Sequence, residues 1–433
     1  MLRSNRISQL IFAIGVKIRN PSLHQIYRDL KSTDFASMTE LRCRQLTKLK
    51  AIVKFAAKYS DYYKRVFDDH AFDYRSDLTT LDDIKLLPVI CKKDLIRFNS
   101  AIHTVDNFEF SKLFFAETSG STGEALTFFK DEYWDSANRA SIQRGMSWYG
   151  VEPWQRNGYF WGFNFSRMAK VRIAVQDWLL NRFRIFTYED KDILRFIEKS
   201  RQAIYIHGYS SMIYEVAKRA NELGIKLCDI SLIKGTSEKI YPHYHDETRK
   251  AFGLKIISEY GAAETGIIAF ECPHGSMHIN EEMCIVEVAQ GQIIVTNLVG
   301  RSFPVIRYRL GDYIRLSDRK CECGRQHRII EEVTGRVGKS VVGATGKKFP
   351  SLTFYYIFKN LALDKNIQIN YKAIQESPGE LRLLLDRNLS PDEVRYLRDE
   401  FEKYFGSELV VRLEENVKLH DRKSKLMDFE SLL

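Results

Sequence analysis

Residues 117–126 read ETSGSTGEAL, and this stretch interrupts a chain that is otherwise rich in large apolar side chains. Two glycines, Gly120 and Gly123, stand among four hydroxyl-bearing residues. Backbone N–H groups freed by glycine can converge on an anion, and hydroxyls add donors, so the stretch is typical of a phosphate-binding loop. Glycine and serine are also typical of an ordinary surface turn. The rest of the chain has to decide between these two interpretations.

The segments on either side of this loop are predicted to be strands. KLFFA at 112–116 precedes the loop, and ALTFFK at 125–130 closes it. A loop between two strands differs from the strand-to-helix P-loop of the Walker type, and the Gly-Lys-Ser/Thr ending of that motif is missing. We therefore expect any phosphate site here to follow another pattern.

Composition narrows the class of protein. The chain has 433 residues, of which 44% are hydrophobic and 28% charged, as in an ordinary globular protein with two or more domains. The formal net charge is +10, but Lys and Arg form no long run, so we expect no nucleic-acid partner. Seven cysteines, an odd number, indicate reduced thiols and a cytoplasmic location. Nothing in the composition predicts the oligomeric state.

The N-terminus MLRSNRISQLIFAIGVKIRN, residues 1–20, looks like a short amphipathic or interfacial segment. Its uninterrupted apolar run LIFAIGV is only seven residues long, too short to span a bilayer. No small-residue cleavage site follows, which argues against a signal peptide. The segment predicts at most a weak peripheral contact with a membrane.

The order of the predicted elements indicates an α/β protein. Strand-like and helical segments alternate between about residues 203 and 265, which predicts a mostly parallel sheet with helices on its faces. Ligands of such sheets gather beyond the carboxyl ends of the strands. We expect a large N-terminal domain at 1–336, helical over about 1–90 and with a β-rich subdomain at about 275–336. The remaining residues, 337–433, are expected to form a small α+β domain.

Four motifs follow one another along the chain. They are TSGSTGEAL (118–126), SEYGAAETG (258–266), IRYRLGD (306–312) and GRVGK (335–339). In this order they resemble the adenylate-forming enzymes, and within them the phenylacetate–CoA ligases and the CapK-type capsular polysaccharide biosynthesis proteins. Each motif alone is weak evidence, because short patterns have many false matches. The resemblance extends over nearly the whole chain.

The resemblance implies an ATP-dependent ligase that converts a carboxylic acid into its acyl-adenylate and releases pyrophosphate. The small C-terminal domain would be a mobile lid. The acyl group would then pass to the thiol of coenzyme A, or to an amine or hydroxyl of a sugar in surface-polysaccharide assembly. The alternative is a non-catalytic relative that retains the fold as a nucleotide-binding or scaffolding module.

The resemblance also assigns the residues that would bind ATP. The loop would hold the β- and γ-phosphates, Tyr260 would offer a flat surface to adenine, and Asp312 would accept both ribose hydroxyls. Within the loop, Glu124 stands where lysine is common in the family, so a cation must come from elsewhere. The full nucleotide-binding set is Thr118, Ser119, Gly120, Ser121, Thr122, Gly123, Gly235, Thr236, Ser237, Glu238, Tyr260, Gly261, Ala262, Asp312 and Arg336.

Two further residues would carry the chemistry. Glu264 offers a hard oxygen ligand for Mg²⁺. A lysine near the C-terminus would stabilise the charge that develops between the carboxylate and the α-phosphate. Lys425 fits that place best, and Lys423 is a close competitor. The alternatives without a catalytic role are that Glu264 belongs to an ordinary turn at the end of a strand, and that the lysines belong to a solvated basic tail.

The identity of the acid cannot be read from the sequence. We expect WGFNFSRM and IHGYSS to line its pocket, with Phe163, Phe165, His207 and Tyr209 as candidates. Three aromatic rings and one imidazole suit an aryl acid, an amino acid or a uronic acid.

A separate cluster predicts a metal site. Cys272 and His278 lie in ECPHGSMHI, while Cys321 and Cys323 lie in CECGR. Four sulfur and nitrogen ligands suit tetrahedral Zn²⁺, and a site closed by four protein ligands would be structural. His274 is the alternative to His278, and reduced thiols without metal are the alternative to the whole site.

Overall fold

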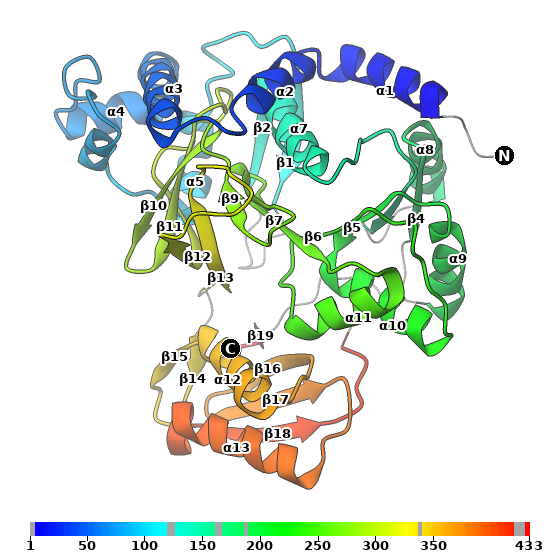
Figure 1. Ribbon diagram of the computed structural model, residues 1–433. Coiled ribbons are helices and arrows are strands. Elements are labelled where there is room, and N and C mark those ends of the chain that lie inside the picture. The colour runs from blue at the N-terminus through cyan, green and yellow to red at the C-terminus, as the bar shows by residue number, and fades with distance from the viewer. Residues whose placement is uncertain (1–4, 119–125, 161–166, 186–188, 337–339, 420–428) are drawn as a thin grey trace.

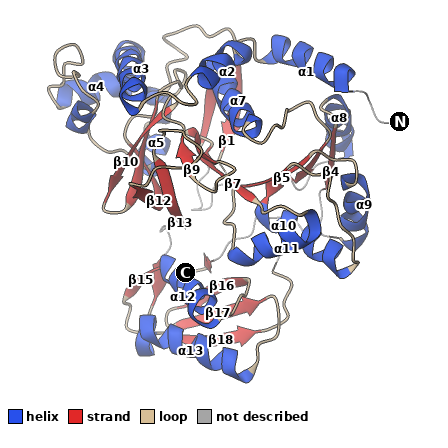
Figure 2. Ribbon diagram, in the orientation of Figure 1, coloured by secondary structure: helices blue, strands red, loops and turns tan. Residues whose placement is uncertain are grey.

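The computed structural model describes residues 5–118, 126–160, 167–185, 189–336, 340–419 and 429–433. Figure 1 shows a large body that contains a long twisted sheet, with a smaller C-terminal domain below it. Figure 2 shows helices on both sides of that sheet. The predicted α/β fold class is therefore confirmed.

The central element is an 11-stranded sheet in the order β10-β11-β12-β13-β9-β8-β7-β6-β5-β3-β4. Strands β4, β3, β5, β6 and β7 run parallel, and from β7 to β10 every neighbouring pair is antiparallel. The strands are β3 (Asn157–Phe160), β4 (Arg182–Ile185), β5 (Tyr205–Tyr209), β6 (Leu232–Thr236), β7 (Ile257–Ala262), β8 (Gly266–Glu271), β9 (Met277–Ile279), β10 (Cys284–Ala289), β11 (Gln292–Asn297), β12 (Tyr308–Ser317) and β13 (Ile329–Arg336). The strands predicted at about 275–336 belong to this sheet and lie beyond β8 in its order.

Helices cover the parallel half of the sheet. The helices α9 (Asp190–Ser200), α10 (Ser210–Glu222) and α11 (Pro242–Phe252) enclose one apolar core, which includes Phe160, Ile206 and Ile233. The helices α7 (Glu132–Ser147) and α8 (Arg167–Leu179) lie against β8 and β4. Alternating strand residues therefore face two different layers, as the period of two in a strand requires.

The N-terminal part is helical and packs over the antiparallel half of the sheet. Its largest core cluster joins Leu49, Val53, Phe128 and Tyr308. The loop at 117–126 connects two paired antiparallel strands, as predicted. The elements are α1 (Asn5–Arg19), α2 (Leu23–Ser32), α3 (Met38–Tyr59), α4 (Asp61–Asp69), η1 (Asp82–Leu86), α5 (Lys92–Arg97), α6 (Asn99–Ile102), β1 (Leu113–Glu117) and β2 (Thr127–Asp131).

The C-terminal domain has a sheet and a core of its own. Its four-stranded sheet has the order β18-β17-β16-β19, and a short β14–β15 hairpin lies beside it. Its elements are β14 (Ser340–Val342), β15 (Lys348–Pro350), α12 (Leu352–Lys365), β16 (Tyr371–Ser377), β17 (Glu380–Leu385), α13 (Pro391–Phe405), η2 (Gly406–Glu408), β18 (Val410–Glu414) and β19 (Phe429–Ser431). The sequence predicted the β16–β17 hairpin, α13 and β18, but not β19.

Local signals explain where two of these helices begin or end. Gly253 closes α11 with φ +72°, a left-handed conformation that costs glycine nothing and most other residues about 1 kcal/mol. Ser390 and Glu393 form a complete capping box at the start of α13. Such a cap stabilises a helix by about 1 kcal/mol, and both features were predicted from the sequence.

One buried contact joins the C-terminal domain to the large body. His243 Nε2 on α11 lies 2.7 Å from Asn370 Oδ1, just before β16. Asp386 holds Asn370 from the other side, because the Asn370 amide donates to Asp386 Oδ2 at 2.8 Å. Asn370 is thus positioned by its own domain before it meets His243.

Candidate functional site

Tyr260 and Asp312 meet at the carboxyl edge of the parallel strands. The Tyr260 hydroxyl, on β7, donates to Asp312 Oδ2, on β12, at 2.7 Å. A glycine must follow Tyr260, because a Cβ at Gly261 would lie 2.4 Å from the Gly266 carbonyl oxygen in the facing strand β8. Asp312 is buried, so its carboxylate has a fixed position and offers a strong acceptor to hydroxyl donors.

The backbone of Arg336 is paired with that of Asp312 in the sheet. Strands β12 and β13 are antiparallel, and their register pairs Asp312 with Arg336. Three nucleotide-binding candidates from three separate motifs therefore converge on one place, since Tyr260 is bonded to Asp312 and Arg336 lies beside it.

Glu264 lies in the turn between β7 and β8 and is buried. The Tyr308 hydroxyl, from β12, donates to its Oε1 at 2.9 Å. Gly266 ends this turn with φ +77°, where a side chain would strain the backbone. A carboxylate held by one hydroxyl keeps lone pairs for a hard cation, which suits the predicted Mg²⁺ ligand.

Residues 235–238 lie at the end of β6, on the way to α11, and pass beside the start of α10. A Cβ at Gly235 would lie 2.5 Å from Ser210 Oγ and would also touch two isoleucines, so only glycine fits. Ser237 has φ +65°, and the chain turns back there toward α10. The Glu238 carboxylate accepts from the Ser211 N–H at 2.9 Å, at the positive end of the α10 dipole.

The phosphate loop lies mostly outside the described residues. Ser119, Gly120, Ser121, Thr122 and Gly123 belong to the segment 119–125, about which the structure says nothing. Thr118 closes the base of the loop. Its hydroxyl accepts from the Leu126 N–H at 2.9 Å, and its own N–H donates to the Leu126 carbonyl oxygen at 2.9 Å. Lys425 and Lys423 lie in 420–428, which is also outside the described residues.

Lys130 is a candidate that the motifs did not reveal. It stands on β2, directly after the loop, and its Nζ lies 5.3 Å from the ring centroid of Trp134 and 5.8 Å from that of Phe128. Burial lowers the pKa of Lys130, and the carboxylates of Asp135 and Glu264 partly oppose that shift. Within the described part of the chain, no carboxylate oxygen lies within 4 Å of this ammonium group. A partly buried ammonium group loses hydration, and titratable groups with shifted pKa values cluster at functional sites.

The acid-pocket candidates are only partly described. Phe163 and Phe165 fall within 161–166, outside the described residues. His207 lies in the sheet, where its ring stacks on Tyr159 with centroids 4.5 Å apart. Burial, followed by the nearby charges of Arg182, Lys234 and Arg184, holds the pKa of His207 well below its usual range, so the ring is neutral. Tyr209 ends β5 on the same face, two residues closer to the carboxyl edge.

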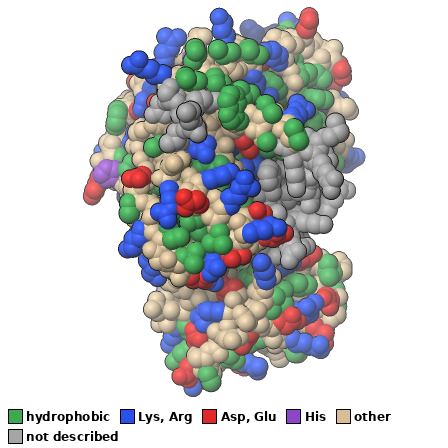
Figure 3. Space-filling view, turned by 90° about the vertical axis from the view of Figure 1, so that its right-hand side faces the viewer, with side chains coloured by type: hydrophobic (Ala, Val, Ile, Leu, Met, Phe, Trp, Pro, Cys, Tyr) green, Lys and Arg blue, Asp and Glu red, His purple; other side chains and the backbone are tan. Residues whose placement is uncertain are grey.

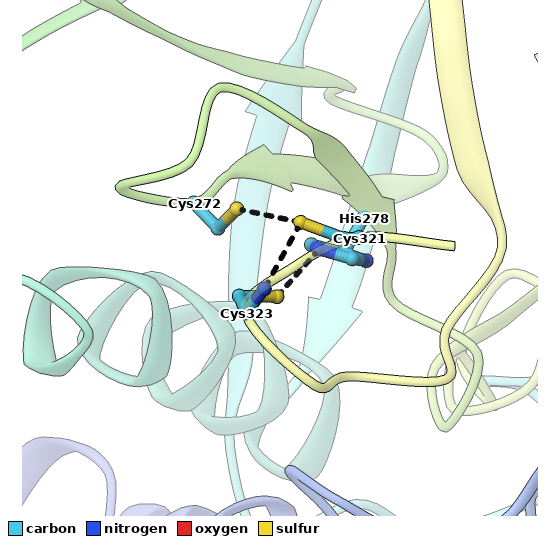
Figure 4. Close-up of side chains that lie close together, drawn as sticks. All are labelled: Cys272, His278, Cys321 and Cys323. Carbon is cyan, nitrogen blue, oxygen red and sulfur yellow. Dashed lines mark hydrogen bonds between the residues drawn. The ribbon is translucent and has the colours of Figure 1, made fainter. Parts of the chain in front are cut away.

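The four predicted metal ligands lie close together, although they come from two distant segments of the chain. Cys272 follows β8 and His278 lies on β9, while Cys321 and Cys323 lie between β12 and β13. Their ligand atoms all lie within 4.8 Å of one another. Cys272 Sγ lies 3.6 Å from Cys321 Sγ, and Cys323 Sγ lies 3.2 Å from His278 Nε2. Figure 4 shows the four side chains gathered together. The sulfur–sulfur distance is far too long for a disulfide and close to the edge, about 3.8 Å, of a tetrahedral zinc–thiolate site.

The surroundings favour His278 as the ligand over the alternative, His274. The Nδ1 atom of His278 donates to the carbonyl oxygen of His327 at 3.1 Å, which turns Nε2 toward the cysteines. Burial is the main cause that lowers the pKa of His278 to about 4, so its imidazole is neutral, as metal binding requires. His274 is half-exposed and lies 3.7 Å from Glu322.

Comparisons with known proteins identify the fold. No protein-family model matches the chain. Solved structures of 2-hydroxyisobutyryl-CoA ligase match it over 92% of its length at 16% identity. The TM-score is 0.69 for that ligase in the postadenylation state with 2-HIB-AMP, where 91% of the ligase is covered. It is 0.60 in the thioesterification state with 2-HIB-AMP and CoA, where 92% is covered.

The chain has the adenylate-forming ligase fold. The resemblance seen in the sequence is thus confirmed in three dimensions. Among curated proteins, the chain is similar to Protein CapK of Staphylococcus aureus, with 22% identity over 299 residues. The alignment covers 63% of this chain and 63% of CapK, so the chain spans less than two thirds of the length of that relative.

The sequence motifs did not indicate several contacts around the candidate site of this adenylate-forming fold. Tyr308 lies within the IRYRLGD motif, yet its contact with Glu264 depends on strand pairing. Lys130 has one sequence signal, since it is the first basic residue after a loop that lacks the expected lysine. Lys234 and Glu259 form a buried ion pair between β6 and β7, which no motif indicated.

Proposed function

We propose that this protein uses ATP to convert a carboxylic acid into an acyl-adenylate and then transfers the acyl group to an acceptor. The observation that carries this proposal is the convergence of Tyr260, Asp312 and the backbone of Arg336 at one edge of the sheet. These residues come from separate motifs, and their shared position supports a common ligand. In this assignment Asp312 binds the ribose, while Tyr260, Gly261, Ala262 and the segment 235–238 flank the adenine.

Positive charge at the reacting phosphates would come from a Mg²⁺ ion held by Glu264 and from two lysines. Glu264 would hold Mg²⁺, which would neutralise negative charge on the phosphates. Lys130 would supply the cation that the loop 119–125 lacks, and its place on β2, directly after the loop, supports this role. Lys425 would reach the α-phosphate only during adenylation, when the lid formed by 337–433 is closed over the 1–336 domain.

The Cys272, His278, Cys321 and Cys323 cluster is assigned to a structural Zn²⁺. It has four protein ligands, so no position remains for a reacting water. Zinc would tie the β8–β9 turn to the β12–β13 connection. That connection belongs to the same two strands that place Asp312 opposite Arg336.

The acceptor class is a thiol such as coenzyme A, or an amine or hydroxyl of a sugar in surface-polysaccharide assembly, and the reaction would take place in the cytoplasm. A screen of pyrophosphate release over aryl acids, amino acids and uronic acids, with and without coenzyme A, tests the proposal. We expect release with one acid class and none from the Asp312→Ala variant. A wild-type protein that binds ATP but releases no pyrophosphate with any acid would instead favour the non-catalytic alternative.

A further inference from the structure

Helix α1 presents apolar residues on two opposite faces. Its inner face packs on the protein, since Val16 is buried and the Phe12 ring lies 5.6 Å from that of Trp154. Its outer face carries a second stripe, formed by Ile7, Leu10, Ile14 and Ile18, whose exposed fractions range from 50% to 66%. A helix on the surface of a globular protein normally shows one apolar stripe and a polar outer face. The second stripe therefore needs another explanation.

Helix α8 continues this apolar surface. Val171, Val175 and Trp178 recur at helical spacing, and their exposed fractions are 67%, 56% and 64%. Helices α1 and α8 contact each other, although about 150 residues separate them in the sequence. Figure 3 views the molecule from this side and shows hydrophobic side chains gathered near its top, with Lys and Arg side chains beside them. The α1–α8 surface, defined by these seven residues, is a broad patch and not a set of isolated side chains.

The exposed charged side chains that α1 and α8 themselves carry, among those the structure describes, are all basic. The first 20 residues include four basic and no acidic side chains, and Arg6 and Lys17 are exposed on α1. Arg172 is exposed on α8. The single acidic residue of α8, Asp177, is buried and forms an ion pair with Arg184 at 2.8 Å. An apolar patch bordered by cations complements a surface that is apolar inside and anionic outside.

We propose that the α1–α8 surface docks on an anionic phospholipid bilayer. Amphipathic helices bind in the plane of the interface when their apolar face is buried among acyl chains and their basic residues meet anionic head groups. Tryptophan favours the head-group level, which suits the exposed Trp178. Among the described residues, no helix is long and apolar enough to cross a membrane, so the contact is peripheral. This docking does not depend on the ligase assignment.

Co-sedimentation of the full chain with lipid vesicles tests this proposal. Vesicles of pure phosphatidylcholine are compared with vesicles that contain about 30% phosphatidylglycerol, an anionic lipid. The test variant carries Leu10→Glu and Ile14→Glu. The matched control carries Leu86→Glu and Val410→Glu, two positions of similar exposure, 58% and 61%, outside the α1–α8 surface. Circular dichroism verifies that both variants are folded.

We expect the wild type and the control to bind the anionic vesicles, and the test variant to bind about tenfold less or weaker still. Binding of the wild type should also fall as NaCl is raised to about 0.5 M, because the cations contribute through screened attraction. Equal binding of the test and control variants would overturn the proposal. The proposal would also be overturned if the wild type does not bind vesicles but forms a dimer, and if the Leu10→Glu, Ile14→Glu variant is a monomer. In that case a second copy of the chain covers this surface.

Discussion

Replacement of Asp312 by alanine is the sharpest test of the nucleotide site. In the proposed complex the carboxylate accepts two ribose hydroxyls, and each charge-assisted bond contributes about 1.5–3 kcal/mol. Asp312 is only 8% exposed, so water replaces these bonds poorly. The sum, about 3–6 kcal/mol, corresponds to an ATP affinity about 10²- to 10⁴-fold weaker at 1.4 kcal/mol per factor of ten. We expect the lower part of this range, because neighbouring bonds are not additive.

The same substitution has a second, separable effect on stability. It leaves the Tyr260 hydroxyl without its 2.7 Å acceptor, which costs about 1–3 kcal/mol if water cannot replace it. Tyr260→Phe serves as the control, because it removes the same bond but keeps the carboxylate and an aromatic ring. Calorimetry with ATP should therefore show a large loss for Asp312→Ala and a small one for Tyr260→Phe. If folded Asp312→Ala binds ATP as the wild type does, the ribose does not lie at Asp312.

Three further predictions address the metal and the two lysines. Metal analysis should find about one Zn²⁺ per chain. The double variant Cys321→Ser, Cys323→Ser should have a lower zinc content and a lower melting temperature. A wild-type protein that is fully folded without metal would contradict this prediction. Lys130→Met should reduce pyrophosphate exchange by about tenfold or more, while leaving the melting temperature unchanged or higher, because it removes a partly buried charge whose pKa burial already lowers. If exchange equals that of the exposed-site control Lys112→Met, Lys130 does not belong to the site. Lys425→Ala should reduce pyrophosphate exchange by about a hundredfold with little change in ATP affinity, because the charge of Lys425 acts in the transition state. An equal loss in Lys423→Ala would show that the assignment of the catalytic lysine to Lys425 is wrong.

Local sequence signals predicted much of this protein. The Gly253 helix end, the Ser390 capping box and the alternation of strands and helices between 203 and 265 depend on residues a few positions apart. The clustering of Cys272, His278, Cys321 and Cys323 was also predicted, because their chemistry is specific even when their spacing is not. The order of the four motifs predicted the adenylate-forming fold through the resemblance to that family.

Tertiary structure decided the features that depend on pairing between distant segments. Strand β4 has four residues and β19 has three, and such short strands have no periodicity to detect in the sequence. Strands β9–β13 extend the main sheet because β9 pairs with β8, a contact that no local pattern encodes. Likewise, only folding joins Tyr260 to Asp312, 52 residues away, places Lys130 over the Trp134 ring and brings α8 next to α1. The sequence determined which chemical groups and turns this protein has, because these are local properties. The tertiary structure decided which of these groups lie in contact, because burial and strand register depend on the whole chain.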